Sequence, residues 1–136
     1  MNRQRSGFEK LDVYRLAEDL ADSVCKAVRQ WNVLDRDTVG KQMIRAADSV
    51  GANIAEGYGR GTPADNRRCV RIAIGSLYET KHWLRRAYQR ELFSAAEIDT
   101  LKPLLEKLLP MLNAYLNSIG RQRIVPTSDL QPTTHD

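Results

Sequence analysis

The sequence predicts an all-α protein folded as an antiparallel up-down four-helix bundle. Four segments place apolar residues at intervals of three and four, which is the period of an amphipathic helix. Short connections that contain helix-capping residues separate these segments, and no segment shows the alternation of a half-buried strand. Four such helices bury their apolar faces most economically by packing against one another.

Length and composition agree with a single globular domain. The chain has 136 residues, of which 42% are hydrophobic and 28% charged, and this is enough to bury a core without disulfides or a metal. We assign residues 1–7 to a flexible basic N-terminus and residues 8–119 to the bundle. Residues 120–136 are rich in Pro, Thr, Ser and Asp, and we expect a disordered tail there.

The sequence also indicates a location. No apolar run reaches the length of a membrane span, and the polar N-terminus leads into no apolar signal segment. Cys25 and Cys69 fall within or beside apolar stripes, where we expect reduced thiols. A cytoplasmic protein with no membrane partner is therefore expected.

The first helix is expected over residues 8–31, and residues 32–36 form a short connection. Asp35 or Asp37 is expected to cap the second helix. The apolar face of the first helix consists of Tyr14, Ala17, Leu20, Ala21, Val24 and Val28.

The second helix is expected over residues 37–56 and carries two adjacent stripes. The apolar stripe is formed by Met43, Ala46, Ala47, Val50 and Ile54. The polar stripe is formed by Gln42, Arg45, Ser49, Asn53 and Glu56. Two interpretations of the polar stripe stay open: hydrogen bonds between neighbouring helices or subunits, or a binding site for nucleic acid or a small ligand.

Glycines 57, 59 and 61 end this helix. They follow a helix and not a strand, and they lack the Gly-Lys-Ser/Thr of a phosphate loop, so a tight turn between two helices explains them.

The last two helices have clear starts. Thr62 is a good N-cap and Pro63 suits the first helical position of a helix that reaches about residue 90. Residues 94–97 form a capping box for the fourth helix.

Pro103 and Pro110 each remove an amide donor from the fourth helix, so a kink or a local break is expected there. The apolar stripe of the third helix is Cys69, Val70, Ala73, Leu77, Leu84 and Ala87; that of the fourth is Ile98, Leu101, Leu105, Leu108, Leu112, Tyr115 and Ile119.

The net charge of +4 is unevenly distributed along the chain. Residues 60–90 carry eight cations against two acids, a local charge of +6, whereas the rest of the chain sums to −2. Like charges at intervals of three and four repel one another, and a local basic array favours a polyanionic partner. The candidate nucleic-acid-binding residues are Arg60, Arg67, Arg68, Arg71, Lys81, Arg85, Arg86 and Arg90.

Three explanations of this basic face remain open: contact with nucleic acid, contact with an acidic protein, or simple solvation. Arg favours the first, because its planar fork binds two phosphate oxygens. Tyr58, Tyr78 and Tyr88 are candidates for stacking on bases, although tyrosines in a small bundle more often lie at the edge of the core.

Catalytic and cofactor chemistry have little support in the sequence. No group of His, Cys, Asp and Glu has the spacing of metal ligands, and His82 lies among arginines on an exposed face. Ser49, Ser76 and Cys69 have no evident base nearby in the sequence. We expect no enzymatic activity, no metal and no cofactor.

Four motifs resemble one known family. They are FEKLDVY at residues 8–14, QMIRAA at 42–47, SVGANIAEG at 49–57 and GSLYE at 75–79. With them the chain resembles, over residues 8–118, the four-helix-bundle proteins encoded by intervening sequences of bacterial 23S rRNA genes, once called S23 ribosomal proteins. One departure is Asn66, where the family often carries an aromatic residue, and this affects the expected local packing.

The resemblance extends to the accessory proteins of diversity-generating retroelements, which are similar bundles that form five-membered rings and work with a reverse transcriptase and its RNA. It implies a ring-shaped homo-oligomer, a pentamer, whose partners are RNA or DNA and a reverse transcriptase. We therefore expect a non-catalytic, oligomeric nucleic-acid-binding protein, with RNA as the favoured ligand. The alternative is a protein-interaction scaffold that docks an acidic partner.

Overall fold

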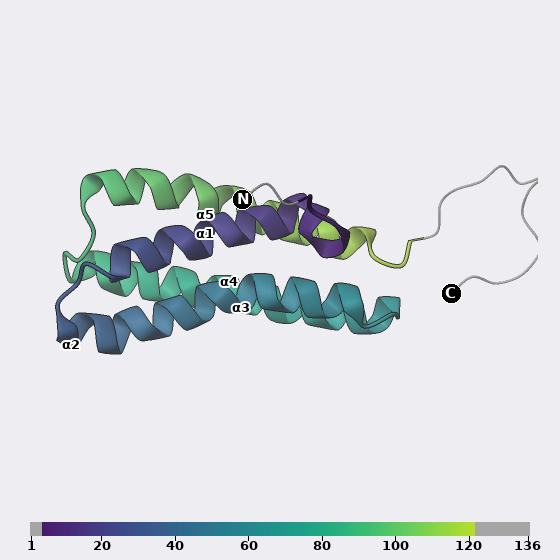
Figure 1. The fold of residues 1–136 in the computed structure, drawn as a ribbon, viewed down its shortest axis with the longest axis horizontal. Helices are drawn as coiled ribbons and strands as arrows, with labels where there is room; N and C mark the ends of the chain where they lie inside the picture. Colours follow the sequence, from purple (N-terminus) through teal and green to yellow (C-terminus); the bar gives the residue numbers. More distant parts are fainter. Residues whose placement is uncertain (1–3, 122–136) are drawn as a thin grey trace, which may run out of the picture.

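The computed structural model describes residues 4–121 and contains a bundle of helices (Figure 1). A short 3-10 turn, η1, comes first, and a π-type turn, η2, joins the short helix α2 to α3. The elements are η1 (Gly7–Lys10), α1 (Asp12–Val28), α2 (Val33–Asp35), η2 (Arg36–Gly40), α3 (Lys41–Gly59), α4 (Pro63–Gln89) and α5 (Ala95–Ser118). None of the helices in residues 4–121 is long and apolar enough to cross a membrane.

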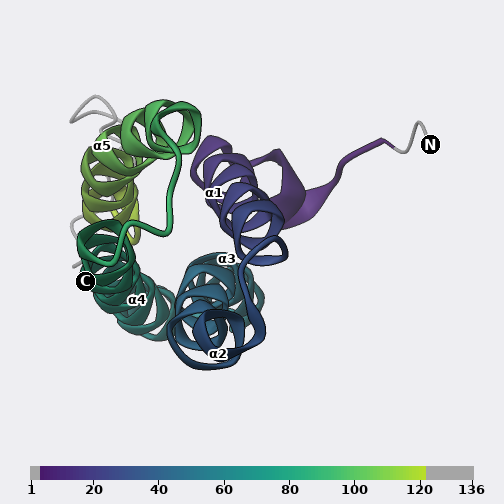
Figure 2. The same ribbon diagram turned by 90° about the vertical axis from the view of Figure 1, so that its left-hand side faces the viewer.

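The four long helices confirm the predicted all-α bundle. Seen from one end, they follow one another around a closed ring in the order α1, α3, α4, α5, and α5 returns to pack beside α1 (Figure 2). Each helix runs antiparallel to its predecessor (Figure 1). The contact between α3 and α4 is the most extensive of the four neighbouring pairs, and that between α4 and α5 is the least extensive.

The core draws on all four long helices, as the predicted stripes require. Tyr14 and Ala21 of the first predicted stripe are only half-buried. In the last predicted stripe the half-buried residues are Ile98, Leu105, Tyr115 and Ile119. The largest side chains that are fully buried are those of Leu20, Met43, Ile54, Leu77, Leu108 and Leu112.

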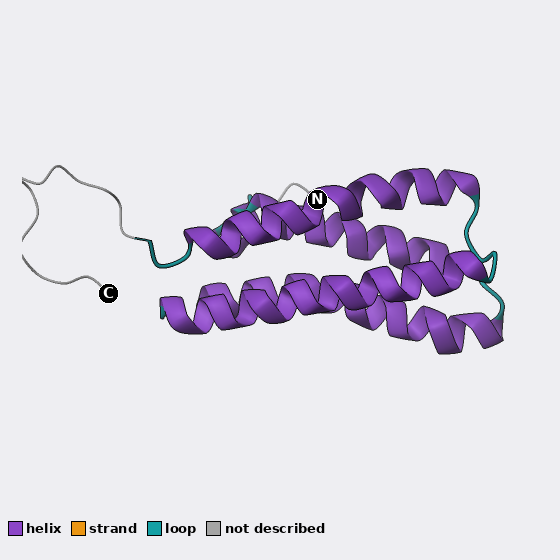
Figure 3. Cartoon of the chain, turned by 180° about the vertical axis from the view of Figure 1, so that it is seen from behind, coloured by secondary structure: helices purple, strands orange, loops and turns teal. Residues whose placement is uncertain are grey.

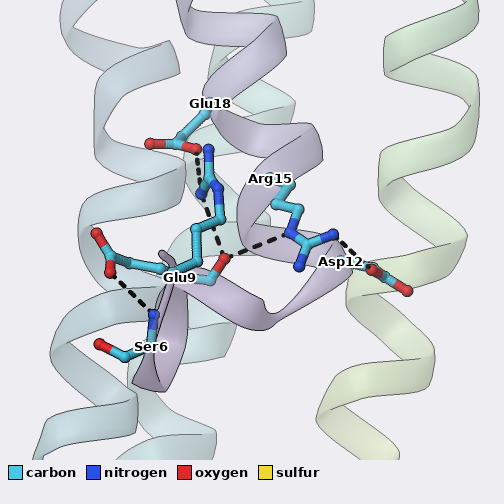
Figure 4. Close-up of polar contacts among 6 residues, drawn as sticks. Ser6, Glu9, Asp12, Arg15 and Glu18 are labelled. Carbon is cyan, nitrogen blue, oxygen red and sulfur yellow. Dashed lines mark hydrogen bonds and ion pairs between the residues drawn. The ribbon is translucent and has the colours of Figure 1, made fainter. Parts of the chain in front are cut away.

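The first helix begins four residues later than predicted. Leu11 has an extended backbone, with ψ 128°, so the preceding residues form the separate turn η1. Two hydrogen bonds to Glu9 hold the turn η1 in place (Figure 4). The Ser6 N–H donates to Glu9 Oε1 at 3.2 Å, and Arg15 Nε donates to the Glu9 carbonyl at 3.4 Å. Phe8 packs edge-on against Tyr14, with ring centroids 4.8 Å apart, and this contact fixes the turn on the bundle.

The second helix begins earlier than predicted, and its cap is Asn32 and not Asp35 or Asp37. The Asn32 side chain accepts a hydrogen bond from the Asp35 N–H at 3.0 Å. Helical structure then continues through the π-type turn η2 into α3. Gly40 is buried in this turn, where a Cβ would lie 2.6 Å from Val28 Cγ1, so glycine is needed for the close passage of α1.

The fourth predicted helix does not break at its prolines. α5 is continuous from Ala95 to Ser118 and is drawn as one coil in Figure 3. Pro103 and Pro110 are exposed, as are Asp99 and Glu106, whose carbonyls lose their helical donors. Because these carbonyls face solvent, water can satisfy them and the helix continues.

The predicted starts of α4 and α5 are confirmed. Thr62 Oγ1 accepts a hydrogen bond from the Asp65 N–H at 3.2 Å. Ser94 Oγ accepts from the Glu97 N–H at 3.1 Å, and the Glu97 side chain accepts from the Ser94 N–H at 2.9 Å, which completes the capping box.

Gly57 allows the close approach of α3 to α4. A Cβ at this position would lie 2.9 Å from Cys69 Cβ and 3.1 Å from the Asn66 carbonyl oxygen. We expect Gly57→Ala to lower the free energy of unfolding by about 1–3 kcal/mol, because α4 has to move. The measurement is urea unfolding followed by circular dichroism.

The matched control is Gly75→Ala within α4. A Cβ there meets nothing within 4 Å, so this substitution should raise the free energy of unfolding by up to about 1 kcal/mol through helix propensity. If both substitutions stabilise the protein equally, the contact at Gly57 is not tight.

Candidate nucleic-acid interface

The predicted basic residues lie on and beside one helix, opposite the core. α4 buries Val70, Ala73 and Leu77, and its cations occupy the other side of the helix. Arg60 and Arg90 follow the last residues of α3 and α4. The six cations within α4 itself are Arg67, Arg68, Arg71, Lys81, Arg85 and Arg86.

Half of the eight cations already have partners. Arg60 pairs with Glu56 at 3.0 Å, and Arg68 lies 3.8 Å from Asp65. Arg86 Nη1 donates to the side chain of Gln89 at 2.7 Å. The fourth, Arg67, forms a contact between helices.

Arg67 joins the start of α4 to the end of α5. Its Nη1 donates to the Ile119 carbonyl at 3.0 Å. Gly120 has a φ of +80°, and a Cβ there would collide with the Arg67 guanidinium. Because Arg67 is half-buried and its guanidinium is bonded to the backbone just after α5, this guanidinium is less available to an external partner than those of the exposed cations.

Four cations remain for an external partner. Arg71, Lys81, Arg85 and Arg90 are exposed, and none has an ion pair with another residue in the 4–121 range. Arg71, Lys81 and Arg85 lie within about 80° of one another around the helix, at 100° per residue. They form the exposed centre of the basic face.

Two tyrosines share this face. Tyr78 and Tyr88 are 55% and 62% exposed, so neither lies at the edge of the core. The Lys81 ammonium lies 5.4 Å from the centroid of the Tyr78 ring, a cation–π contact. Tyr58 is also exposed, but it belongs to α3, and its ring packs against Phe8 with the ring centroids 6.4 Å apart.

The polar stripe of α3 divides into two parts. Asn53 Nδ2 donates to the Ser49 carbonyl at 2.8 Å and to Ser49 Oγ at 2.9 Å, and the Ser76 hydroxyl of α4 donates to Ser49 Oγ at 2.9 Å. These residues connect two helices. Ser76 was considered from the sequence only as a nucleophile, and this hydrogen bond to α3 was not predicted.

The rest of the stripe faces outward. Glu56 pairs with Arg60 and not with the other stripe residues. Gln42 and Arg45 are exposed. The stripe is therefore only partly a helix-to-helix contact, and its outer residues are available to a subunit or a ligand.

A groove lies between α4 and α5, where this pair of helices packs least extensively. Its volume is about 540 Å³, and its charged lining residues are Arg85 and Lys102. The other lining residues are Leu84, Tyr88, Phe93, Ile98, Leu101 and Leu105. Lys102 was not a candidate in the sequence analysis, because its relation to α4 depends on how α5 docks.

The described residues contain no group of three His, Cys, Asp or Glu side chains that could hold a metal ion. Cys25 and Cys69 are free thiols, partly and fully buried respectively, as predicted. His82 is exposed and its ring stacks edge-on against Trp83 at 4.7 Å.

Comparison with known proteins gives a family and a fold. Residues 9–114 match the model of the 23S rRNA-intervening sequence protein family. A crystal structure of a protein of unknown function from the S23 ribosomal protein family, from Bacteroides thetaiotaomicron, is similar with a TM-score of 0.66 and 20% sequence identity. The similarity covers 78% of this chain and 99% of that one. No match was found among curated proteins.

Arg67, which is bonded to a backbone carbonyl, and Arg71, which is exposed, should contribute differently to stability. We expect Arg67→Ala to lower the free energy of unfolding by about 1 kcal/mol, because the Ile119 carbonyl loses a charged donor. Arg71→Ala, a matched change on the exposed face, should alter it by less than about 0.5 kcal/mol. Equal values from thermal unfolding would show that Arg67 has no special structural role.

Two acidic residues on α1 and α3 make a separate prediction. Partial burial raises the pKa of Asp48 on α3, and the charge of Asp22 on α1 raises it further. The raised pKa means that the folded state favours the protonated form of Asp48. The contribution of Asp48 to the free energy of unfolding is therefore fully present at low pH and is lost as the pH rises through the folded-state pKa.

Asp48→Asn should therefore stabilise the protein near pH 7 and have little effect at about pH 3.5, below the ordinary pKa of the group. Urea unfolding at the two pH values measures the difference. An equal gain in the free energy of unfolding at both pH values would mean that the substitution acts through packing and not through charge.

Proposed function

The chain belongs to the family of 23S rRNA-intervening sequence proteins, and we propose that it is a non-catalytic, oligomeric protein that binds nucleic acid, in particular RNA. The observation that supports this most directly is the exposed centre of the basic face, where Arg71, Lys81 and Arg85 have no ion pair within residues 4–121. The first and last of these positions are 14 residues apart, or about 21 Å along the helix.

Such an array suits a phosphate backbone. The cations project from one rigid helix, and guanidinium groups bind phosphate oxygens in pairs. Contacts of this kind supply affinity and position but no direct sequence readout, and they release counterions on binding. Binding should therefore depend steeply on salt and weakly on sequence.

The proposed assembly is a ring-shaped homo-oligomer, a pentamer, in the cytoplasm. Exposed apolar side chains support self-association: Val33 and Leu34 of α2 are 61% and 72% exposed, and Ile72 of α4 is 45% exposed. The resemblance to accessory proteins of diversity-generating retroelements supports a reverse transcriptase as a further partner.

The second candidate is a scaffold that docks an acidic protein. The groove between α4 and α5 favours it, because its floor is apolar and both of its charged lining residues are cations. A continuous basic band in the assembled oligomer would favour nucleic acid, and an isolated basic patch ringed by apolar residues would favour a protein.

The test is a salt series with labelled structured RNA, single-stranded RNA and duplex DNA. The slope of log K against log salt should become shallower by about 2–3 in the triple variant Arg71→Ala, Lys81→Ala, Arg85→Ala, because three phosphate contacts are lost. Light scattering in the same buffers gives the oligomer mass.

The control variant removes the same charge elsewhere, through Arg29→Ala, Lys41→Ala and Lys107→Ala, which are all exposed. Its slope should stay close to that of the unaltered protein. If the salt slopes of the two variants are equal, the α4 face is not the binding surface. If the unaltered protein binds no nucleic acid even at low salt, the scaffold is favoured.

A further inference from the structure

Four exposed residues of α4 form a straight ridge. Tyr78, Lys81, Arg85 and Tyr88 follow one another at intervals of three, four and three, so their side chains lie along one line of the helix surface. Tyrosines stand at the two ends and cations stand between them. We call these four residues the tyrosine–cation ridge.

The ridge borders the groove between α4 and α5. Arg85 and Tyr88 line the groove from α4, and Lys102 lines it from α5. The floor includes Leu84, Leu101 and Leu105. The groove therefore has cations on both walls, an aromatic ring at its border and no acidic lining residue.

We infer that the ridge and the groove bind single-stranded nucleic acid, with bases stacked on Tyr78 and Tyr88 and phosphates held by Lys81, Arg85 and Lys102. This inference rests on the proposed function and narrows its ligand class.

The exposed rings select unpaired bases. In a duplex the faces of the bases are covered by neighbouring base pairs, whereas a single strand can offer them to aromatic side chains. More than half of each tyrosine is exposed. Lys81 covers part of the Tyr78 ring through its cation–π contact, and a base can use the remaining surface.

The spacing sets the path of the strand. Tyr78 and Tyr88 are ten residues apart, or about 15 Å along the helix, which is too far for two successively stacked bases. An extended strand would cross the ridge with its backbone near Lys81 and Arg85 and place two non-adjacent bases on the rings. Lys102 would hold the backbone from the opposite wall.

An acidic amphipathic helix is the competing occupant of the groove. Such a helix is anchored by apolar side chains that enter the groove at intervals of three and four. The ridge offers it two cationic side chains between two tyrosines, all of them exposed, with no aliphatic residue among the four. This pattern fits stacking and phosphate contacts better.

The experiment compares a labelled 12-nucleotide RNA strand without self-complementarity with the duplex of the same sequence, at one salt concentration. The full chain should bind the single strand at least about tenfold more tightly. The double variant Tyr78→Leu, Tyr88→Leu should lose about 25-fold or more of single-strand affinity, the product of two stacking losses of about fivefold. Duplex affinity should change less than about threefold.

The matched variant Tyr78→Phe, Tyr88→Phe keeps the rings and should keep the single-strand affinity. An RNA strand that carries 2-aminopurine should lose fluorescence on binding to this variant and to the unaltered protein, but much less with the leucine variant. Lys102→Ala should make the single-strand salt slope shallower by about 0.7, whereas Lys107→Ala, on the α1 side of α5, should not.

Three outcomes would overturn the inference. Equal binding of single strand and duplex, unaffected by the leucine variant, would leave phosphate binding in place without stacking. Loss of affinity in the phenylalanine variant as well would assign the effect to the hydroxyl groups. Displacement of the RNA by an acidic helical peptide that binds the leucine variant equally well would make the groove a protein site. Absence of any RNA binding would instead refute the proposed function itself.

Discussion

The close contact between α3 and α4 determines how the rest of the bundle is arranged. Gly57 allows the two helices to approach, and Ser49 and Ser76 connect them by a hydrogen bond of 2.9 Å. The same approach buries Asn66 Oδ1 without a hydrogen-bond partner among the described residues, a cost that the surrounding packing offsets. Once one side of α4 is committed to α3, its opposite side is presented to solvent.

The charges on α4 follow from this arrangement. A helix that is tightly held on one side can carry several like charges on the other, because packing and not side-chain attraction keeps it helical. Arg67 and Arg60 are engaged by neighbouring groups, so they stabilise the ends of the helices. Arg71, Lys81 and Arg85 have no ion pair with another residue in the described part of the chain, and these three exposed cations give the face its candidate function.

The sequence was most informative where structure is local. The capping roles of Thr62 and Ser94 depend on a few neighbouring residues, and both were predicted correctly. The apolar stripes identified the four helices, because their period depends only on helix geometry. The fold class was therefore predictable from the chain alone.

Features that depend on tertiary contacts were predicted less well. The cap is Asn32 and not either aspartate, because helical structure already begins at Val33 and then continues through the π-type turn that contains Gly40. Pro103 did not break α5 because it faces solvent. The exposure of Tyr78 and the position of Lys102 beside α4 depend on how α5 docks, which no local pattern states.

The two prolines have a further consequence for motion. α5 lacks two internal hydrogen bonds and has the less extensive of the two contacts that α4 makes with its neighbours in the bundle. Local opening of a folded protein begins where such restraints are fewest. α5 is thus the helix whose amide protons should exchange earliest, and its outward swing would widen the space beside α4 without disturbing the pairing of α3 with α4.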